Sequence, residues 1–353
     1  MVAACPEENI VISPLSATTN LSMVVNACDE ETRDRLLGEF GFGDINDLNT
    51  YNARVISSLP NCQPSKVTVG LANSIWYNSD FGASGKEGYS ALMTELYAAD
   101  QQSLSLSDAA SIDRINGWIS EKTNNIIPDF YKPGDLDAAT VAWVNALYFK
   151  GIWDVPFDES LTSEQPFHNA QGEEIGTVPM MVTPEFIGWY YESEKGVGAE
   201  LVYGDYAFRM RIFVPAEGVA LADVVSEAFE WDEFVEKHVY LTVKLPRFST
   251  EYEYRLDAAL SHAGMDIGDV KLKEIVTTQH PDGLPYGSLG SKQRTRIDVD
   301  ETGTVAAAVT ATGMYMSDMP TSKAEVCFDR PFVYVISEYF SRTPIIAGVV
   351  VKP

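Results

Sequence analysis

The sequence has few of the residues that build metal and redox sites, with four histidines and four cysteines in 353 residues. It contains no CxxC pair and no HExxH motif, and its histidines form no local cluster. We therefore expect no metal and no cofactor. We interpret the histidines as isolated residues and most of the cysteines as buried free thiols. These residues are His168, His238, His262, His280, Cys5, Cys28, Cys62 and Cys327.

Sequence signatures of enzymes are also missing. No GxSxG nucleophile elbow occurs. The glycine-rich residues 38–43 neither follow a predicted strand nor open a βαβ unit, so a nucleotide site is not expected. The adjacent carboxylates Glu30-Glu31 and Glu173-Glu174 are typical of a solvated surface in an acidic chain. We expect that the protein is not an enzyme, and an unrelated acidic hydrolase is kept only as an alternative.

Basic residues are scarce: 25 Lys and Arg stand against 51 Asp and Glu, for a net charge of -26. A chain this acidic repels phosphate backbones, anionic membrane surfaces and acidic polysaccharides, so we expect no nucleic-acid or membrane partner. No run approaches the roughly 18 apolar residues of a membrane span. The start of the chain lacks an intact signal peptide. We expect a trimmed form of a secreted, extracellular protein.

The hydrophobic patterns predict an α+β protein of one domain, residues 1–353. Ser13 and Pro14 are typical of a helix start, as N-cap and first-turn residue. Helices are predicted mainly in the first third of the chain and strands in the remainder. The predicted helices cover 14–25, 29–40, 113–127 and 256–263, with some helix in the polar residues 43–66. The predicted strands cover 67–76, 141–149, 202–215, 239–248, 294–299, 326–328, 332–337 and 345–351.

Residues 301–320 (ETGTVAAAVTATGMYMSDMP) stand apart from ordinary structure. Between 302 and 317 they contain no charge and no proline, and most are small or β-prone. Such a segment suits a central strand, yet it is an aggregation hazard if exposed. One interpretation is a strand that is already buried, or an alanine-rich helix. The other is a stored strand that enters a sheet later, with alternate residues facing inward. Those residues are Thr304, Ala306, Ala308, Thr310, Thr312 and Met314.

A series of segments from residue 9 to the C-terminus resembles the serpin family in sequence and in order. Jointly these segments are highly specific, although each alone is moderate. The resemblance implies the serpin fold, with three β-sheets, about eight to nine helices and an exposed reactive-centre loop at about 301–322. The segments are 9–16 (NIVISPLS), 71–76 (LANSIW), 115–118 (INGW) with Thr123-Asn124, 144–153 (VNALYFKGIW) with Pro156-Phe157, 178–181 (VPMM), 301–308 (ETGTVAAA) and 329–332 (DRPF).

What the resemblance implies is a suicide inhibitor of serine proteases. A protease cleaves the loop and forms an acyl-enzyme, and residues of about 304–316 then insert as a new strand in sheet A. The hinge that starts this insertion matches Glu301, Gly303, Thr304, Ala306, Ala307 and Ala308. Its residues are small, which favours an inhibitor over a non-inhibitory binding or carrier serpin. The expected partner is a serine protease held in a covalent acyl complex.

The reactive bond is expected at Met316–Ser317, with Ser317–Asp318 as second choice. Counting from Gly303 and counting back from Pro331 disagree by about three residues, so the spacing departs from that of typical members. Tyrosine and methionine near the bond, and the absence of Arg and Lys, favour a chymotrypsin-like or elastase-like target. A cysteine protease is the alternative target.

Other family positions show departures. The shutter matches Ser13, Ser16 and Asn145, but the family's histidine falls on Gln293, which can still donate and accept hydrogen bonds. The breach matches Trp153. The first helix of the family is missing or truncated, which together with few glycosylation loops leans towards a prokaryotic member.

The resemblance also bears on partners and assembly. The helix D region lacks a basic cluster, so we expect no heparin binding. We expect a monomer that can also form loop–sheet polymers, since an insertable strand can add to the sheet of another molecule.

Overall fold

The computed structural model describes residues 7–59, 66–229, 235–265, 270–287, 292–304 and 320–353. These residues form seven α-helices and two single-turn 3-10 helices, η2 (Ser79–Phe81) and η3 (Glu159–Leu161). The expected eight to nine helices are therefore an overestimate for the described chain, where short helical segments stop after one turn. The helices are α1 (Pro14–Ala27), α2 (Glu30–Glu39), α3 (Ile45–Ser58), α4 (Glu87–Tyr97), α5 (Ala109–Lys122), α6 (Leu221–Phe229) and α7 (Leu256–His262).

The strands form one six-stranded sheet, one ten-stranded sheet and two short pairs. The six-stranded sheet has the order β12-β16-β17-β5-β2-β4, with β12 (Phe248–Arg255), β16 (Lys292–Val299), β17 (Gly303–Thr304), β5 (Val141–Ile152), β2 (Val67–Asn78) and β4 (Ala99–Leu104). The short pairs are β13 (Val270–Leu272) with β15 (Leu284–Gly287), and β14 (Ile275–Val276) with β3 (Ser84–Gly85).

The ten-stranded sheet has two parts that meet at β11 (Val235–Pro246). The first half of β11 pairs with β8, and its second half pairs with β7 and β18. Counted with the six-stranded sheet, these two parts fit the expected three sheets. The strands are β1 (Ile10–Ile12), β6 (Ser163–His168), β7 (Glu174–Val182), β8 (Phe186–Glu192), β9 (Gly196–Tyr203), β10 (Phe208–Pro215), β18 (Lys323–Cys327), β19 (Phe332–Glu338) and β20 (Pro344–Val350).

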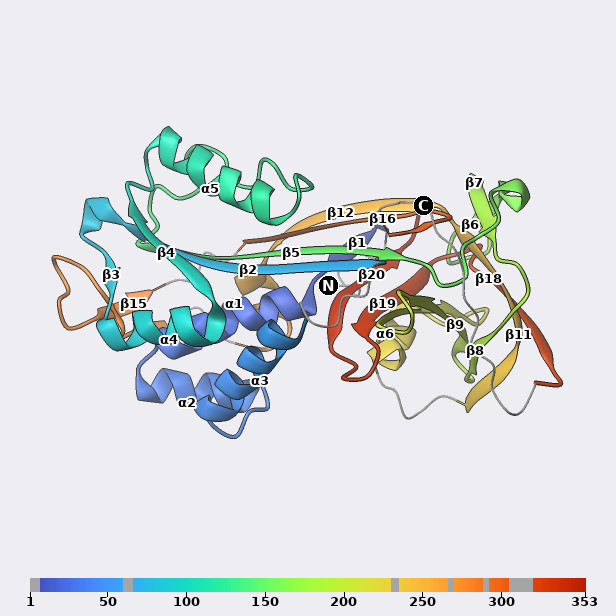
Figure 1. Cartoon of the computed structure of the whole chain (residues 1–353), viewed down its shortest axis with the longest axis horizontal. Coiled ribbons are helices and arrows are strands. Elements are labelled where there is room, and N and C mark those ends of the chain that lie inside the picture. The colour runs from blue at the N-terminus through green and yellow to red at the C-terminus, as the bar shows by residue number, and fades with distance from the viewer. Residues whose placement is uncertain (1–6, 60–65, 230–234, 266–269, 288–291, 305–319) are drawn as a thin grey trace.

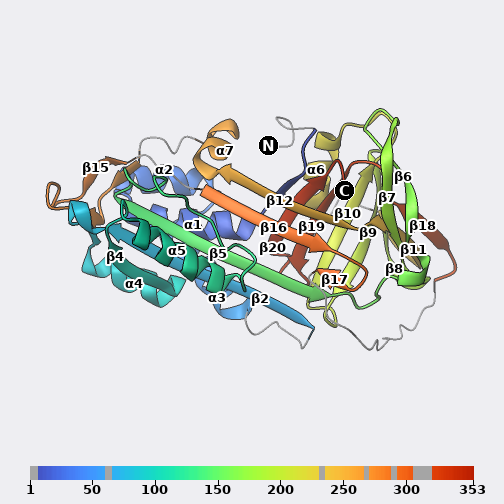
Figure 2. The same cartoon turned by 90° about the horizontal axis from the view of Figure 1, so that it is seen from above.

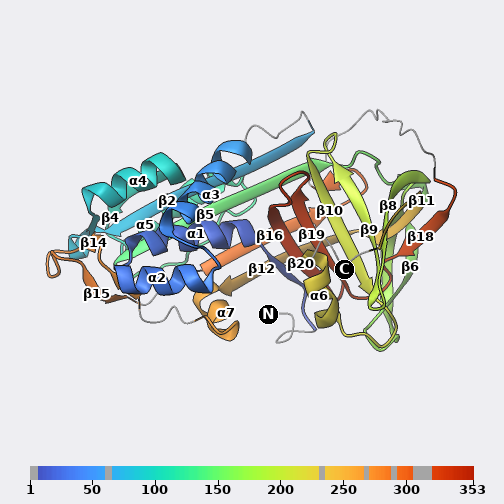
Figure 3. The ribbon, with the colours of Figure 1, turned by 90° about the horizontal axis from the view of Figure 1, so that it is seen from below.

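Helices lie on both faces of the six-stranded sheet at the end that contains β4. Figure 1 shows α5 on one face and α1 to α4 on the other, and Figure 3 shows the second face directly. Apolar residues of α5, including Ile112, Ile115 and Ile119, pack on Trp76 and Val144 of the sheet. The largest apolar cluster fills the space between the two sheets. One face of the sheet is thus buried, whereas Glu251 and Arg296 are exposed on the other face, beyond α5.

Local chemistry explains where several elements begin. The side chain of Ser13 accepts a hydrogen bond from the amide of Ser16, with Pro14 as the first residue of α1. Asp29 and Asp44 cap α2 and α3 in the same way. The strand–helix order predicted for residues 9–25 is confirmed. Within the described residues, no helix is long and apolar enough to cross a membrane.

Several boundaries predicted from the sequence are wrong. The strand predicted over 239–248 spans the break between β11 and β12, and the helix predicted from residue 113 begins at Ala109. The strand predicted over 202–215 is split into β9 and β10 by a turn in which Gly204, Asp205 and Tyr206 have positive φ. The amides of Asp205 and Tyr206 donate to the carboxylate of Asp154, a distant residue that no local pattern reveals. The helix predicted to reach residue 127 ends at Lys122.

The physical reason for the early helix end is the backbone at Asn124 and Asn125. Both residues have a left-handed φ, of 54° and 63° respectively, and asparagine tolerates this conformation better than most residues. A helix cannot continue through two such residues. The chain after α5 therefore becomes an irregular segment, residues 123–140, which returns to β5.

Candidate functional site

The site is a slot in the six-stranded sheet between β5 and β16. The two-residue strand β17 lies between them at one end, where Gly303 and Thr304 pair with Ile152 and Gly151 of β5. Thr304 also pairs with Val299 of β16. Figure 2 shows β17 seated between its two neighbours. Among the described residues, no ladder joins β5 to β16 directly, and β17 is the strand that lies between them.

A small cavity lies between β5 and β16 farther along the slot. Its volume is about 20 Å³, which is room for about one water. Residues from β5, β16, α5, the start of α1 and the segment after α5 enclose it. The lining comprises Ser13, Ser16, Ile119, Ile127, Phe130, Val144, Asn145, Ala146, Leu147, Gln293, Arg294 and Thr295.

The hinge residue Thr304 faces the interior, with 1% of its surface exposed. Its hydroxyl lies 2.8 Å from the hydroxyl of Tyr203, a buried residue of the core between the sheets. Gly303 lies against the β5 backbone, where an added Cβ would stand 2.1 Å from the carbonyl oxygen of Gly151. Only glycine allows this close approach.

Glu301 anchors the base of the hinge. Its carboxylate is 5% exposed and accepts hydrogen bonds from Arg247 at 2.6 and 3.2 Å and from the Thr162 hydroxyl at 2.8 Å. Burial by itself raises the pKa of Glu301, but the Arg247 and Thr162 hydrogen bonds outweigh it and hold the pKa below its usual value. The anchor is therefore an ion pair at neutral pH.

Trp153, at the breach, closes the same end of the slot. Its ring is 1% exposed and stacks on Tyr203, with ring centres 4.0 Å apart. The indole N–H donates to the carbonyl of Asp300 at 3.0 Å, and the Trp153 amide donates to the carbonyl of Thr302 at 2.9 Å. The Phe157 amide donates to the carbonyl of Glu301 at 2.9 Å. These bonds fix residues 300–302 beside the entry to the slot.

At the shutter, Ser13 and Gln293 are in direct contact. The Gln293 side chain accepts from the Ser13 amide at 3.3 Å and donates to the Ser13 carbonyl at 3.2 Å. The Tyr254 hydroxyl also donates to Gln293. The Ser13 hydroxyl donates to the Ile345 carbonyl at 2.8 Å and accepts from the Ser16 amide at 3.1 Å. The neutral amide of Gln293 thus both donates to and accepts from the Ser13 backbone.

Asn145 lines the cavity beside Gln293. Its amide nitrogen donates to Asn73 at 2.6 Å, and its side-chain oxygen is buried without a hydrogen-bond partner. A buried oxygen without a hydrogen bond costs free energy of folding. The Asn145 oxygen is therefore an acceptor that is still available in the slot.

Several expected site residues lie outside the described residues. They are Ala306, Ala307, Ala308, Met316, Ser317 and Asp318, and with them both alternatives for the reactive bond. Conversely, sequence reasoning missed Arg247 and Tyr203, which hold Glu301 and Thr304. Arg247 is 54 positions from Glu301, and no motif connects them.

Comparisons with known proteins agree with this geometry. The family model described as "Serpin (serine protease inhibitor)" matches residues 1–353. A protein named "Serine protease inhibitor" from Cyanea capillata is 28% identical over 98% of this chain and 93% of its own length. "Serpin-ZX" of Arabidopsis thaliana is 26% identical, over 98% of this chain and 92% of its own.

A solved structure shows the same fold. The native stressed conformation of Arabidopsis AtSerpin1 superposes with a TM-score of 0.81 at 24% identity, covering 98% of this chain and 92% of that one. The relatives come from plants, a virus, an insect and a jellyfish, so they do not support the expected prokaryotic origin. Because the family model covers every residue of the sequence, the chain belongs to the serpins, a family of protease inhibitors that are generally not enzymes.

Proposed function

We propose that this serpin is a suicide inhibitor of chymotrypsin-like or elastase-like serine proteases. The observation that carries the proposal is β17, two hinge residues seated between β5 and β16, which share no direct ladder among the described residues. An inhibitor must start a strand there, and the small residues of the hinge favour an inhibitor over a carrier. The residues that follow Thr304 in the sequence are small and uncharged, and such residues could extend β17 along the slot.

The β17 register predicts how insertion would continue. Each further residue would pair one position farther back along β5, since the two strands are antiparallel. Ala308 would then lie beside Leu147 and Thr310 beside Asn145. Thr310 would bring a hydroxyl to the unpaired oxygen of Asn145, which favours insertion at the shutter.

The driving force comes from the strand edges. Residues 141–150 of β5 and 292–298 of β16 have no ladder partner on the slot side among the described residues. An inserted strand would add roughly ten backbone hydrogen bonds at about 1 kcal/mol each, on the order of 10 kcal/mol. That is comparable with the stability of a whole domain.

The chemistry before insertion is that of the protease. Its serine oxygen attacks the carbonyl carbon of Met316, and the bond from Met316 to Ser317 breaks. The serine proton passes to the new amino group of Ser317, while an ester joins the protease to Met316. Insertion of 304–316 must be faster than hydrolysis of this ester for the trap to work.

The test is incubation with chymotrypsin and with an elastase, followed by denaturing electrophoresis and intact mass. We expect a covalent band and a released peptide that begins at Ser317. A peptide with another start would move the bond and keep the inhibitor. Cleavage without a covalent band would contradict the proposal. A band with a papain-like enzyme alone would then indicate the cysteine-protease alternative, and its absence would favour a carrier.

A matched pair of variants isolates insertion in this test. Thr304→Glu places a charge at a 1% exposed position against Tyr203 and should turn the inhibitor into a substrate. Thr321→Glu adds the same charge at an exposed position on the far side of the loop and should leave the covalent band unchanged.

A further inference from the structure

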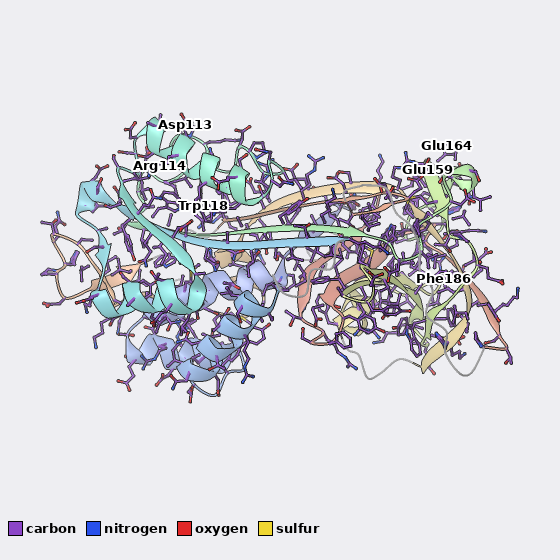
Figure 4. The ribbon with its side chains drawn as sticks, viewed as in Figure 1. Asp113, Arg114, Trp118, Glu159, Glu164 and Phe186 are labelled. Carbon is purple, nitrogen blue, oxygen red and sulfur yellow. The ribbon has the colours of Figure 1, made fainter. Side chains whose placement is uncertain are left out.

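A second hollow lies against β8, β9 and β11 of the ten-stranded sheet. Its volume is about 50 Å³, which is room for about three waters or for a small head group. In Figure 4 the labelled Phe186, which lines this hollow, lies in the half of the molecule opposite to Trp118 of α5. The lining residues that matter here are Asp154, Ile187, Trp189, Glu200, Tyr206 and His238.

The alternation of β9 places the carboxylate of Glu200 at this hollow. Ala199 and Leu201, its neighbours in the strand, belong to the apolar core between the two sheets. Because successive side chains of a strand point to opposite faces, Glu200 points to the other face of the sheet. It is only 1% exposed, so a buried carboxylate lines the hollow.

The two oxygens of Glu200 differ in their hydrogen bonds. Oε2 accepts from the Tyr191 hydroxyl at 2.8 Å and from Arg209 at 3.0 Å, and the Nε atom of Arg211 lies 3.8 Å from it. Oε1 is buried without a hydrogen-bond partner among the described residues. A buried charged oxygen without a hydrogen bond costs free energy of folding, and a donor that enters the hollow would remove that cost.

A second carboxylate, that of Asp154, lines the same hollow. The Asp154 amide donates to the carbonyl of Val202 at 2.8 Å, and its two side-chain oxygens accept from the amides of Asp205 and Tyr206 at 2.8 and 3.2 Å. Burial outweighs these hydrogen bonds and raises the pKa of Asp154, while the nearby cation, Lys66, is paired with Asp205 at 3.2 Å. Within the described residues, the lining thus holds two carboxylates and neither a lysine nor an arginine.

Aromatic rings and an apolar rim complete the hollow. Trp189 of β8 and His238 of β11 lie side by side, with ring centres 4.8 Å apart. The Trp189 indole also donates to the Tyr339 hydroxyl, which fixes the orientation of the ring. Tyr206 and Ile187 are 38% and 37% exposed and form the rim. The faces of tryptophan and tyrosine rings attract cations, and an apolar rim suits an alkyl chain.

We propose that this hollow binds a primary alkylammonium group. The ammonium would donate to Oε1 of Glu200 and to the Asp154 carboxylate, and its alkyl chain would leave over Ile187. An ammonium has three donors and no acceptor, which matches carboxylates that only accept. It is also compact, whereas a guanidinium is a wider planar group that fits a hollow of about 50 Å³ less well.

Two sources share this chemistry, a free alkylamine and the lysine side chain of a partner protein. Neither source involves the reactive-centre loop. The test therefore stands whether or not the chain traps a protease, and its failure would leave the proposed inhibitory function untouched.

The test is calorimetric titration of the intact protein with hexylammonium chloride at about 0.15 M salt, which screens attraction to the acidic surface. We expect one saturable site. Hexan-1-ol is the neutral match and should bind at least about tenfold more weakly, because it offers one donor and no charge. Equal affinity for the two compounds, or the absence of a saturable site for hexylammonium, would overturn the inference.

A matched pair of variants locates the site. Asp154→Asn removes a charge from the lining but keeps an acceptor for the neighbouring turn, and should weaken hexylammonium binding about tenfold. Asp205→Asn removes the same charge in that turn, but Asp205 does not line the hollow, so the affinity should stay unchanged. Equal weakening by both variants would indicate diffuse attraction to an acidic chain and would contradict a defined site.

A third variant keeps the test decisive if Asp154→Asn does not fold. Tyr206→Asn removes the aromatic rim, and asparagine tolerates the left-handed φ of 65° at this position. We expect binding to weaken about threefold through loss of the cation–π contact. Wild-type affinity in this folded variant would overturn the assignment of the hollow.

A lysine derivative distinguishes the two sources. Nα-acetyllysine N-methylamide carries the same ammonium on a stem flanked by peptide groups. Binding tighter than that of hexylammonium would indicate a lysine of a partner protein, and weaker binding would indicate a free amine. Both results support the alkylammonium site, provided that the two compounds compete. Simultaneous, independent binding of the two would contradict a single site.

Discussion

Replacing Gly303 by alanine should expel the hinge from the slot. The new Cβ would stand 2.1 Å from the carbonyl oxygen of Gly151 and 2.8 Å from the Cα of Ile152. Those backbone atoms cannot move aside cheaply, because Gly151 also pairs with Val67 of β2 and the Ile152 amide donates to the carbonyl of Lys66. The hinge must move instead.

The magnitude follows from what the hinge would lose. Displacement of β17 breaks its ladder to β5 and β16 and the 2.8 Å contact between the Thr304 and Tyr203 hydroxyls. Three hydrogen bonds at about 1 kcal/mol each are about 3 kcal/mol of native stability. For a chain of this length that lowers the melting temperature by about 4 °C. If half of the cost is present at the barrier, insertion slows about tenfold.

The assay is calorimetry together with titration of chymotrypsin, which reports the stoichiometry of inhibition. Gly303→Ala should melt earlier and need several inhibitors per protease, since most molecules would be cleaved as substrate. Gly88→Ala is the control, because an added Cβ at Gly88 of α4 meets nothing within 4 Å and should cost no stability. Wild-type melting and stoichiometry for Gly303→Ala would refute the assignment of Gly303 to a close backbone contact.

Three further predictions concern the surroundings of the slot. Glu301→Gln should lower native stability by about 1 kcal/mol at neutral pH. Because its folded pKa lies below the ordinary 4.5, this stabilisation is present above about pH 4.5 and lost as pH falls further, so wild-type and variant melting curves should converge there. Gln293→Ala leaves the Ser13 amide and carbonyl unpaired and should cost about 2 kcal/mol, measured by urea unfolding; an unchanged midpoint would contradict the shutter contacts. Burial raises the pKa of the Cys28 thiol to about 12, so peptide mapping should find it unlabelled at pH 8 in the folded protein, and prompt labelling would contradict its burial.

The parts of the fold that were predictable from the sequence depend on local chemistry. Ser13 and Pro14 mark the start of α1 because a hydroxyl cap and a fixed φ act within one turn. The apolar run that begins at Val141 marks a buried strand because a continuous apolar run is also a local pattern, although β5 continues to Ile152. The resemblance of residues 301–308 to a hinge gave the location of the slot entry.

The contacts that hold the slot were not predictable. Arg247 reaches Glu301 across 54 positions, and Lys292 reaches the carbonyl of Phe130 across 162. An arginine after a strand and a lysine at the start of one are common, and nothing in their neighbours indicates a partner. Backbone carbonyls such as that of Phe130 leave no trace in a sequence at all, so these contacts are visible only once the chain is folded.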